Sequence, residues 1–330
     1  MTRTFTRRAF TAVAAALALT GHGLAQSQGA EGFPNQPIRM VVGFPAGGPT
    51  DVTARLIGES LSRSLGQPVV VDNKPGANAT VAAELVARAK PDGHTILMAA
   101  TNHPINASLY KNLKFDSEKS FSPIMAVAVA PTVLVVNPKF PARTYPELLA
   151  LLKAAPGKYS YASAGNGGTP HLSAEMFKSL TGTSIVHVPY RGAAPAVADL
   201  IGGQVDMSFA TLGSVLPQLQ AGQLRAIAVA APQRSRLIPD VPTFEESGLK
   251  NFRLDSWYGL MAPAGTPKPV IDLLHAEIVK AVSTAAYRQK LNTAGLEPVT
   301  TSNPAQFAEQ LHQEIATYGA LVRTNNVSLD

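Results

Sequence analysis

The sequence predicts an α/β protein built from two similar lobes, one inserted into the other. Short apolar runs typical of buried strands alternate with stretches of helical periodicity almost to the end of the chain. This rhythm of strand, helix and strand indicates βαβ units around mainly parallel sheets. A long β-favouring stretch at 122–136, broken by Pro123 and Pro131, interrupts the first series, and a fresh series follows it. We therefore expect this stretch to cross from one lobe to the other.

The composition excludes several classes of function. With 330 residues, 45% hydrophobic and 15% charged, the chain is globular and long enough for two domains. It contains no cysteine, so it has no disulfide, thiolate metal site or thiol nucleophile. His94, His103, His187 and His275 do not have the spacing of a metal site. No dinucleotide or Walker motif is present, and we expect neither a metal nor a cofactor.

The first 25 residues have the three parts of a secretory signal peptide. Three arginines without an acidic residue precede an apolar run at 11–20, and Gly23-Leu24-Ala25 supplies small residues before a cleavage site. The adjacent Arg7 and Arg8 fit a twin-arginine signal, and an ordinary Sec signal is the alternative. Removal of this segment leaves 25 basic against 22 acidic residues, a balance too mild to indicate nucleic-acid binding. We expect a soluble periplasmic protein.

Each lobe opens with a strand, a glycine turn and a helix. In the first lobe a strand ends near Val42, the turn contains Gly47 and Gly48, and the helix starts at Pro49. Further strands are expected at 67–72 and 95–99, so the ligand end of this sheet lies at 44–51, 73–78 and 100–106.

The second lobe repeats this opening. A strand at 159–163 leads into Gly165-Asn166-Gly167-Gly168, and a helix follows from Pro170. Strands are also expected at 185–188, 205–209 and 224–230, and helices at 145–155 and 194–202. The run 257–262 is a candidate for the second crossing, back to the first lobe, before helices at 268–284 and 304–323.

A helix that begins in a glycine turn is a general anion site. Its first N–H groups have no partner within the helix, and the helix dipole is positive there. A single turn of this kind is more often only a connection between a strand and a helix. Two such turns, one in each lobe, could face each other across a cleft, and the pair favours an anionic ligand.

Several short runs, in their order along the chain, carry a resemblance to one family. They include 43–51, Asn73-Lys74-Pro75-Gly76-Ala77, His187-Val188-Pro189-Tyr190-Arg191-Gly192 and Pro239-Asp240-Val241-Pro242-Thr243. From about Phe33 to the last helix, the chain resembles the extracytoplasmic solute receptors of tripartite tricarboxylate transporters, the Bug or TctC family. Each run is weak by itself, but their number and order are specific.

The resemblance implies a periplasmic binding protein of type II-like fold, with two α/β lobes, two crossing strands and a ligand cleft between the lobes. It places the first lobe at 33–128 and 256–330, and the second at 129–255. It further implies a small carboxylate as ligand, membrane subunits of a tripartite transporter as partners, and a monomer. Mono-, di- and tricarboxylates, acidic amino acids and aromatic acids all remain open, because Asn78-Ala79 and Ala210 depart from common family residues.

The predicted ligand-binding residues lie in the two glycine loops and at strand ends: Phe44, Ala46, Gly47, Gly48, Thr50, Asp51, Asn78, Thr101, Ser163, Gly165, Gly168, Thr169, His171 and Asp206. Three of them have structural alternatives. Asp51 could contact the ligand or only complement its helix dipole. His171 could donate to a carboxylate or hold the glycine turn in shape. Asp206 could fix a loop around the ligand or pair with Arg191.

The competing hypothesis is a periplasmic hydrolase in which Ser163, His171 and Asp206 form a triad. The sequence has no Gly-x-Ser-x-Gly elbow, and the first lobe would then have no role. We expect a binding protein and no enzyme.

Overall fold

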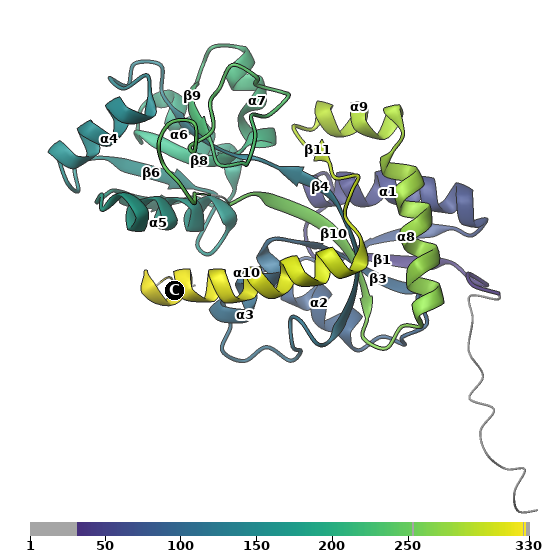
Figure 1. Cartoon of the computed structure of the whole chain (residues 1–330). Coiled ribbons are helices and arrows are strands. Elements are labelled where there is room, and N and C mark those ends of the chain that lie inside the picture. Colours follow the sequence, from purple (N-terminus) through teal and green to yellow (C-terminus); the bar gives the residue numbers. More distant parts are fainter. Residues whose placement is uncertain (1–31, 253, 326, 328–330) are drawn as a thin grey trace, which may run out of the picture.

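The computed structural model describes residues 32–252, 254–325 and 327. The chain forms two α/β lobes, each around its own sheet (Figure 1). The predicted signal peptide lies outside the described residues. Among the residues that are described, no helix combines the length and the apolar character that a membrane crossing requires.

The first lobe contains a six-stranded sheet in the order β11-β4-β10-β3-β1-β2. Its strands are β1 (Ile38–Val42), β2 (Val69–Asn73), β3 (Thr95–Ala100), β4 (Phe121–Ala130), β10 (Ser256–Pro263) and β11 (Glu297–Pro298). β1 pairs in parallel with β2 and β3, whereas β10 runs antiparallel to both β3 and β4. Its helices are α1 (Pro49–Leu65), the 3-10 turn η1 (Ala77–Ala79), α2 (Thr80–Ala87), α3 (Asn102–Leu109), α8 (Lys268–Val282), α9 (Ala285–Thr293) and α10 (Pro304–Thr324).

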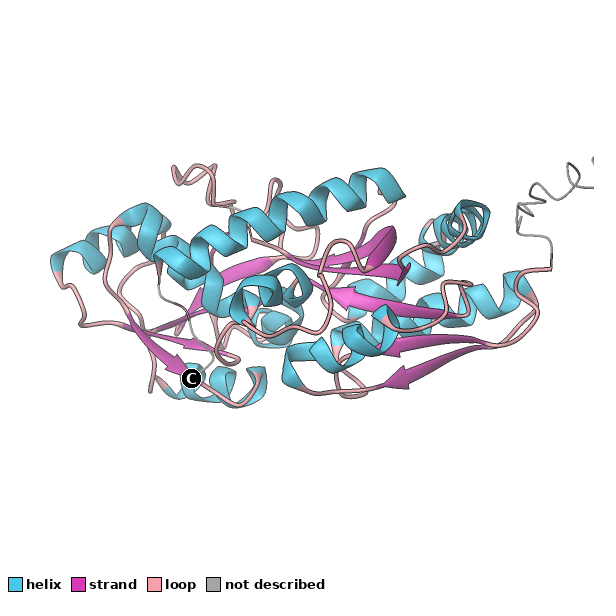
Figure 2. Cartoon of the chain, turned by 90° about the horizontal axis from the view of Figure 1, so that it is seen from below, coloured by secondary structure: helices cyan, strands magenta, loops and turns pink. Residues whose placement is uncertain are grey.

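Helices cover both faces of this sheet, which explains the apolar runs in its strands (Figure 2). Ile38, Met40 and Val42 of β1 pack with α1, α8 and α9. Val41, with the opposite side-chain direction, packs with α2 and α10. Because successive side chains of β1 point to opposite faces, this one strand contributes to the buried apolar clusters on both faces of the sheet.

The second lobe contains a five-stranded sheet in the order β7-β6-β8-β5-β9. Its strands are β5 (Thr132–Val136), β6 (Ser160–Ser163), β7 (Val186–Pro189), β8 (Met207–Thr211) and β9 (Arg225–Val229). Its helices are α4 (Tyr145–Ala154), α5 (Thr169–Thr181), α6 (Ala193–Gly202) and α7 (Leu212–Gln220). Each face again has a buried cluster, one with α4 and α5 and the other with α6 and α7.

Three segments connect the lobes. The predicted crossing stretch is β4 and β5, which belong to different sheets and meet at Pro131. The chain returns before β10, which lies between β3 and β4 in the first sheet. The last helix, α10, extends from the first lobe to α5 of the second, where Tyr318 packs in a buried cluster with Leu172 (Figure 1).

Candidate functional site

A cavity of about 470 Å³ is lined by residues of both lobes. Eight of the predicted residues line it: Phe44, Ala46, Gly48, Thr50, Asn78, Thr101, Gly168 and Thr169. The N-termini of α1 and α5 therefore open onto one space, as the repeated glycine turns indicated. The other lining residues are Pro45, Pro49, Ala100, Asn102, Ala164, Pro170, Ala193, Thr211, Ser256 and Tyr258.

The two glycine loops have almost the same backbone. Gly48 caps α1 with φ −78° and ψ 170°, and Gly168 caps α5 with φ −79° and ψ 166°. The residue before each cap, Gly47 or Gly167, has a φ of 86° or 73°, a left-handed conformation that favours glycine. Both helices have a proline in the first turn, where a missing N–H has no cost.

In both loops, the N–H group of the glycine before the cap residue donates to a side chain four residues further along the chain. Gly47 donates its N–H to Asp51 Oδ2 at 2.9 Å, and Gly167 donates its N–H to His171 Nδ1 at 3.0 Å. Each of these glycine N–H groups is therefore already paired. The N–H groups in the first turns of the two helices are the ones available to a ligand in the cavity. Neither Asp51 nor His171 lines the cavity. For His171 this contact is one of its two predicted alternatives, the support of the glycine turn. Asp51 also supports its loop, whereas its predicted structural alternative was only to complement the helix dipole.

Asp51 is the centre of a polar cluster behind the first loop. It is buried, and its carboxylate also accepts hydrogen bonds from Arg55 at 2.9 Å and from Asn73 Nδ2 at 2.9 Å. Asn73 donates as well to the carbonyl of Phe44, which ties β2 to the loop. Burial alone would raise the pKa of Asp51, but the hydrogen bonds from Arg55 and the loop hold that pKa below its ordinary value.

Aromatic rings support the second loop. His171 stacks on His187 with ring centroids 4.0 Å apart, and His187 stacks on Tyr161 at 4.7 Å. Burial lowers the pKa of His171, and burial together with the neighbouring His171 lowers the pKa of His187 to about 4. Both rings are therefore neutral near pH 7. For His171, the hydrogen bond from the Gly167 N–H also requires an unprotonated Nδ1.

Ser163 and Gly165 also lie behind the second loop. The Ser163 hydroxyl is buried and contacts His187 Nε2 at 2.7 Å. It donates to the carbonyl of Gly165 and accepts from the N–H of that residue. These contacts hold the turn that precedes α5, and neither residue lines the cavity.

The prediction for Asp206 needs a correction. Asp206 precedes β8 and accepts hydrogen bonds from the N–H and hydroxyl of Ser160, at the start of β6. The cavity lies at the other end of these parallel strands, beyond Ser163 and Thr211. The resemblance placed Asp206 in a strand-end segment that lines the cleft, but Asp206 stands at the end of β8 that lies away from this cavity.

The proposed triad is likewise not assembled. Ser163 contacts His187 instead of His171, and Asp206 bonds to Ser160 instead of a histidine. His171 points its Nδ1 at Gly167. Within the described part of the chain, no group of three or more acidic or histidine residues could hold a metal ion.

Sequence reasoning missed the wall that β10 contributes. Ser256 and Tyr258 line the cavity, while Trp257 between them points to the opposite face, packs on Phe307 and donates to Glu314 Oε2 at 2.6 Å. Trp257 therefore packs at the crossing, within the run 257–262 that the sequence indicated as the return to the first lobe. The strand alternation could have identified its two neighbours, because residues on either side of a buried tryptophan in a strand share the other face.

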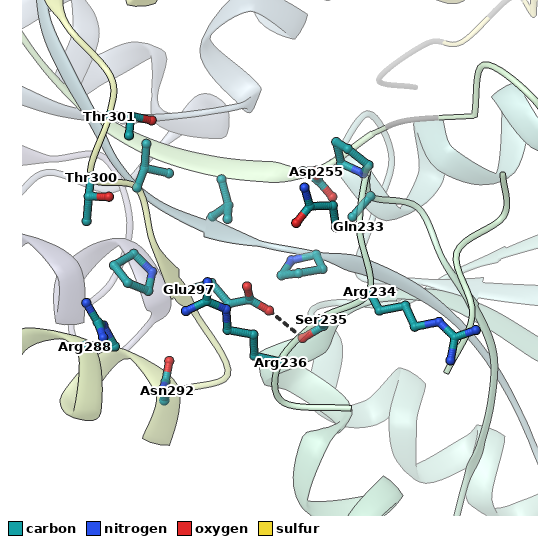
Figure 3. A pocket seen from close by; sticks show the side chains of 16 residues that line it. Gln233, Arg234, Ser235, Arg236, Asp255, Arg288, Asn292, Glu297, Thr300 and Thr301 are labelled. Atoms are coloured by element: carbon teal, nitrogen blue, oxygen red, sulfur yellow. Dashed lines mark hydrogen bonds between the residues drawn. The ribbon is translucent and has the colours of Figure 1, made fainter. Parts of the chain in front are cut away.

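A second cavity of about 590 Å³ lies beside the crossing at Pro131. Figure 3 shows its lining, which includes Arg234, Arg236 and Arg288. Ser235 of the second lobe donates across it to Glu297 of the first lobe at 2.5 Å. None of the predicted ligand-binding residues lines this cavity, and the two glycine loops do not reach it.

Comparison with known proteins agrees with this geometry. The family model described as the tripartite tricarboxylate transporter family receptor, TctC, matches residues 53–327. Protein BugT of Bordetella pertussis is 36% identical over 309 residues, 93% of this chain and 94% of BugT. A UPF0065 protein from the tcbD-tcbE intergenic region of Pseudomonas sp. strain P51 is 38% identical over 283 residues, 86% of this chain and 84% of that protein.

Three solved structures share the whole fold. The periplasmic binding protein BugD is 36% identical with a TM-score of 0.75, covering 90% of this chain and 99% of BugD. Rpa4515 of R. palustris, solved with adipate, is 31% identical with a TM-score of 0.77, covering 90% and 99%. MatC of Rhodopseudomonas palustris, solved with bound malate, is 32% identical with a TM-score of 0.75, covering 88% and 100%. These matches confirm the two-lobed architecture with a cleft, and the chain belongs to the TctC family of tripartite tricarboxylate transporter receptors, which includes the Bug proteins.

Proposed function

We propose that this protein captures a small carboxylic acid in the periplasm and presents it to the membrane subunits of a tripartite tricarboxylate transporter. The observation that carries the proposal is the convergence of two helix N-termini, of α1 and α5, on one cavity between the lobes. A carboxylate there would meet free N–H groups and the positive ends of two dipoles. The relatives that bind adipate and malate support the same class of ligand.

The carboxylate is held by neutral groups. Thr50 and Thr169 are buried in the first turns of the two helices and line the cavity. Their hydroxyls and the first-turn N–H groups can donate to the anion, and such bonds to a charged acceptor are stronger than neutral ones. Each helix dipole adds roughly 0.3–1 kcal/mol, and more when the site is partly buried.

The ligand is bound without covalent change, and the switch is closure of the lobes as units divided near 128–129 and 255–256. The protein acts as a monomer after export by its signal peptide. Ser163, the hydroxyl that a hydrolase would use, is 1% exposed and occupied by the loop that it supports.

Two glycine substitutions test the proposal. A Cβ at Gly48 would meet only Pro45 O, at 3.8 Å, and a Cβ at Gly168 only Pro170 Cδ, at 3.7 Å. Gly48→Val and Gly168→Val should therefore fold. Their side chains would occupy space in the cavity beside the N-termini of α1 and α5. Gly202→Val, at the end of α6 and away from this cavity, is the matched control because its Cβ also has ordinary contacts.

We expect small carboxylic acids to raise the melting temperature of the native protein, since binding to the folded state stabilises it. Titration calorimetry should show at least tenfold weaker binding for both loop variants and native affinity for Gly202→Val. Equal affinity in all four proteins would refute the site. Turnover of an ester or amide that Ser163→Ala abolishes would refute the receptor function.

A further inference from the structure

A short turn with a strained backbone forms one part of the cavity wall. Ala77, Asn78 and Ala79 have φ values of 44°, 51° and 70°, a left-handed conformation that residues other than glycine adopt only at a cost. Such residues persist only where surrounding contacts hold them, and they are concentrated at ligand-binding sites. Asn78, at the centre of the turn, lines the cavity. The contacts that hold this turn therefore also position a residue of the cavity wall.

Two asparagines of α3 supply these contacts. Asn102 and Asn106 lie one turn apart on the same side of the helix, and both are buried. Each donates its Nδ2 to the carbonyl oxygen of Asn78, from Asn106 at 2.8 Å. Asn106 Oδ1 also accepts a hydrogen bond of 2.8 Å from Nδ2 of Asn78. Three hydrogen bonds therefore join the strained residue to one helix.

The turn is also packed from two sides. Ile105, between the two asparagines on α3, lies in a buried cluster with Leu172 of the second lobe and Tyr318 of α10. On the other side, Gly43 follows β1 and leaves room for Ala79, since a Cβ at Gly43 would overlap the Cβ of Ala79. The turn is therefore held between the end of β1 and a helix that is itself fixed.

The same contacts decide which end of the Asn78 amide is available to a ligand. A carbonyl oxygen only accepts hydrogen bonds, so Asn106 must direct its Nδ2 to the Asn78 carbonyl and its Oδ1 to the Asn78 side chain. This oxygen in turn requires Nδ2 of Asn78, which leaves Asn78 Oδ1 for other contacts. Asn78 Oδ1 bonds to no described residue and remains accessible, whereas the unpaired Oδ1 of Asn102 is buried.

Resting on the proposed function, we propose that Asn106 is a positioning residue of the cleft, which orients the Asn78 amide so that Oδ1 accepts a hydrogen bond from the bound acid. An acceptor at this position favours acids that carry a donor, a hydroxyl or an amino group, besides the carboxylate. The contact requires only this donor, so the ligand can carry one, two or three carboxylates.

Three pairs of acids, each differing by one hydroxyl, test the inference: succinate and malate, butyrate and 3-hydroxybutyrate, and benzoate and 4-hydroxybenzoate. In at least one pair, calorimetry should show the hydroxy acid binding about three- to tenfold more tightly than its parent, the gain of one hydrogen bond. Asn106→Leu removes both hydrogen bonds to Asn78 and should abolish this preference. A merely structural role of Asn106 would instead weaken both acids of a pair alike.

Asn78→Gly tests the same contact from the side of the ligand, because glycine adopts the left-handed conformation without cost and lacks the amide. It should lose the preference as well, and adding Asn106→Leu to it should change the ratio of affinities no further. Asn137→Leu is the matched control. Asn137 also makes two side-chain hydrogen bonds, to Leu200 O and Ile201 O, but does not line this cavity. This variant should keep the native preference.

Should Asn106→Leu fail to fold, Asn78→Gly and the acid pairs measured on the native protein still decide. No hydroxyl preference in any pair, an undiminished preference in Asn106→Leu or Asn78→Gly, or an equal loss in Asn137→Leu would overturn the inference and leave the carboxylate receptor standing. Failure of all six acids to bind would overturn the proposed function and this inference with it.

Discussion

Acidification should weaken the second glycine loop while the first stays intact. The hydrogen bond from the Gly167 N–H to His171 Nδ1, 3.0 Å long, requires an unprotonated nitrogen. Protonation at Nδ1 replaces this acceptor with a donor and breaks the contact. A proton on His187 would place a charge in the ring stack, 4.0 Å from His171. Stability should therefore decrease as the pH falls below 6.5, and ligand affinity should decrease as the pH approaches 4, where the folded protein takes up the proton on His187.

The size of the stability change follows from two histidines. The pKa of His187 is lowered from 6.5 to about 4, and burial lowers the pKa of His103, in α3, to about 4 as well. Because both pKa values are depressed in the folded state, the unfolded chain binds more protons between pH 6.5 and 4. The contribution is complete above pH 6.5 and is lost as the pH falls toward 4. At 1.36 kcal/mol per pH unit, each histidine accounts for ~3 kcal/mol across this range.

Urea denaturation between pH 7.5 and 4.5 measures this loss, and calorimetry at pH 7.5 and 4.5 measures ligand affinity. His103→Asn is the matched control, because His103 lies in the first lobe, away from the second loop, and contacts Ser117 O instead. This variant should have a shallower dependence of stability on pH but the native pH dependence of affinity. His187→Asn should flatten both. Stability that is constant from pH 7.5 to 4.5, or an affinity that falls equally in both variants, would refute the reasoning.

Three further predictions concern other contacts. Asp51→Ala removes the acceptor of the Gly47 loop and of Arg55, so unfolding free energy should fall by ~2–4 kcal/mol and affinity at least tenfold; native affinity in calorimetry would contradict this. Burial raises the pKa of Glu314 to about 7, so fluorescence of Trp257, the sole tryptophan, should titrate near pH 7 and stop titrating in Glu314→Gln. In Gly213→Ala, on α7, the new methyl would overlap the carbonyl oxygen of Ala294 in the first lobe. The lobes should separate, which a larger radius of gyration in X-ray scattering would reveal; an unchanged radius with native affinity would contradict it.

Local sequence patterns were sufficient for the supporting frame of the site. The strand, glycine turn and proline-started helix at Gly48 and Gly168 have local causes, so both loops were found in the sequence. The crossing at Pro131 was found for the same reason, because proline interrupts an otherwise continuous β-favouring run.

Contacts between distant segments could not be read in this way. Whether Asp51 faces the ligand or the loop depends on Asn73 and Arg55, and Asn73 belongs to another strand. Tyr258 reaches the cavity only because β10 returns from the second lobe and inserts beside β3. Asp206 was predicted from the resemblance as a cleft residue, and the sequence does not reveal that its carboxylate bonds instead to Ser160 of the neighbouring strand.

The two loops reach the same geometry with different chemistry, and this difference matters for ligand release. In the first loop the acceptor of the glycine N–H is the carboxylate of Asp51, whose lowered pKa keeps it ionised well below pH 5. In the second loop the acceptor is the imidazole of His171, which loses its acceptor nitrogen on protonation. Acid near pH 4, the pKa to which burial lowers the neighbouring His187, would then loosen the carboxylate from the second lobe first, while the first lobe still holds it. Because a closed cleft requires both lobes to contact the ligand, loss of one contact is sufficient to favour the open form.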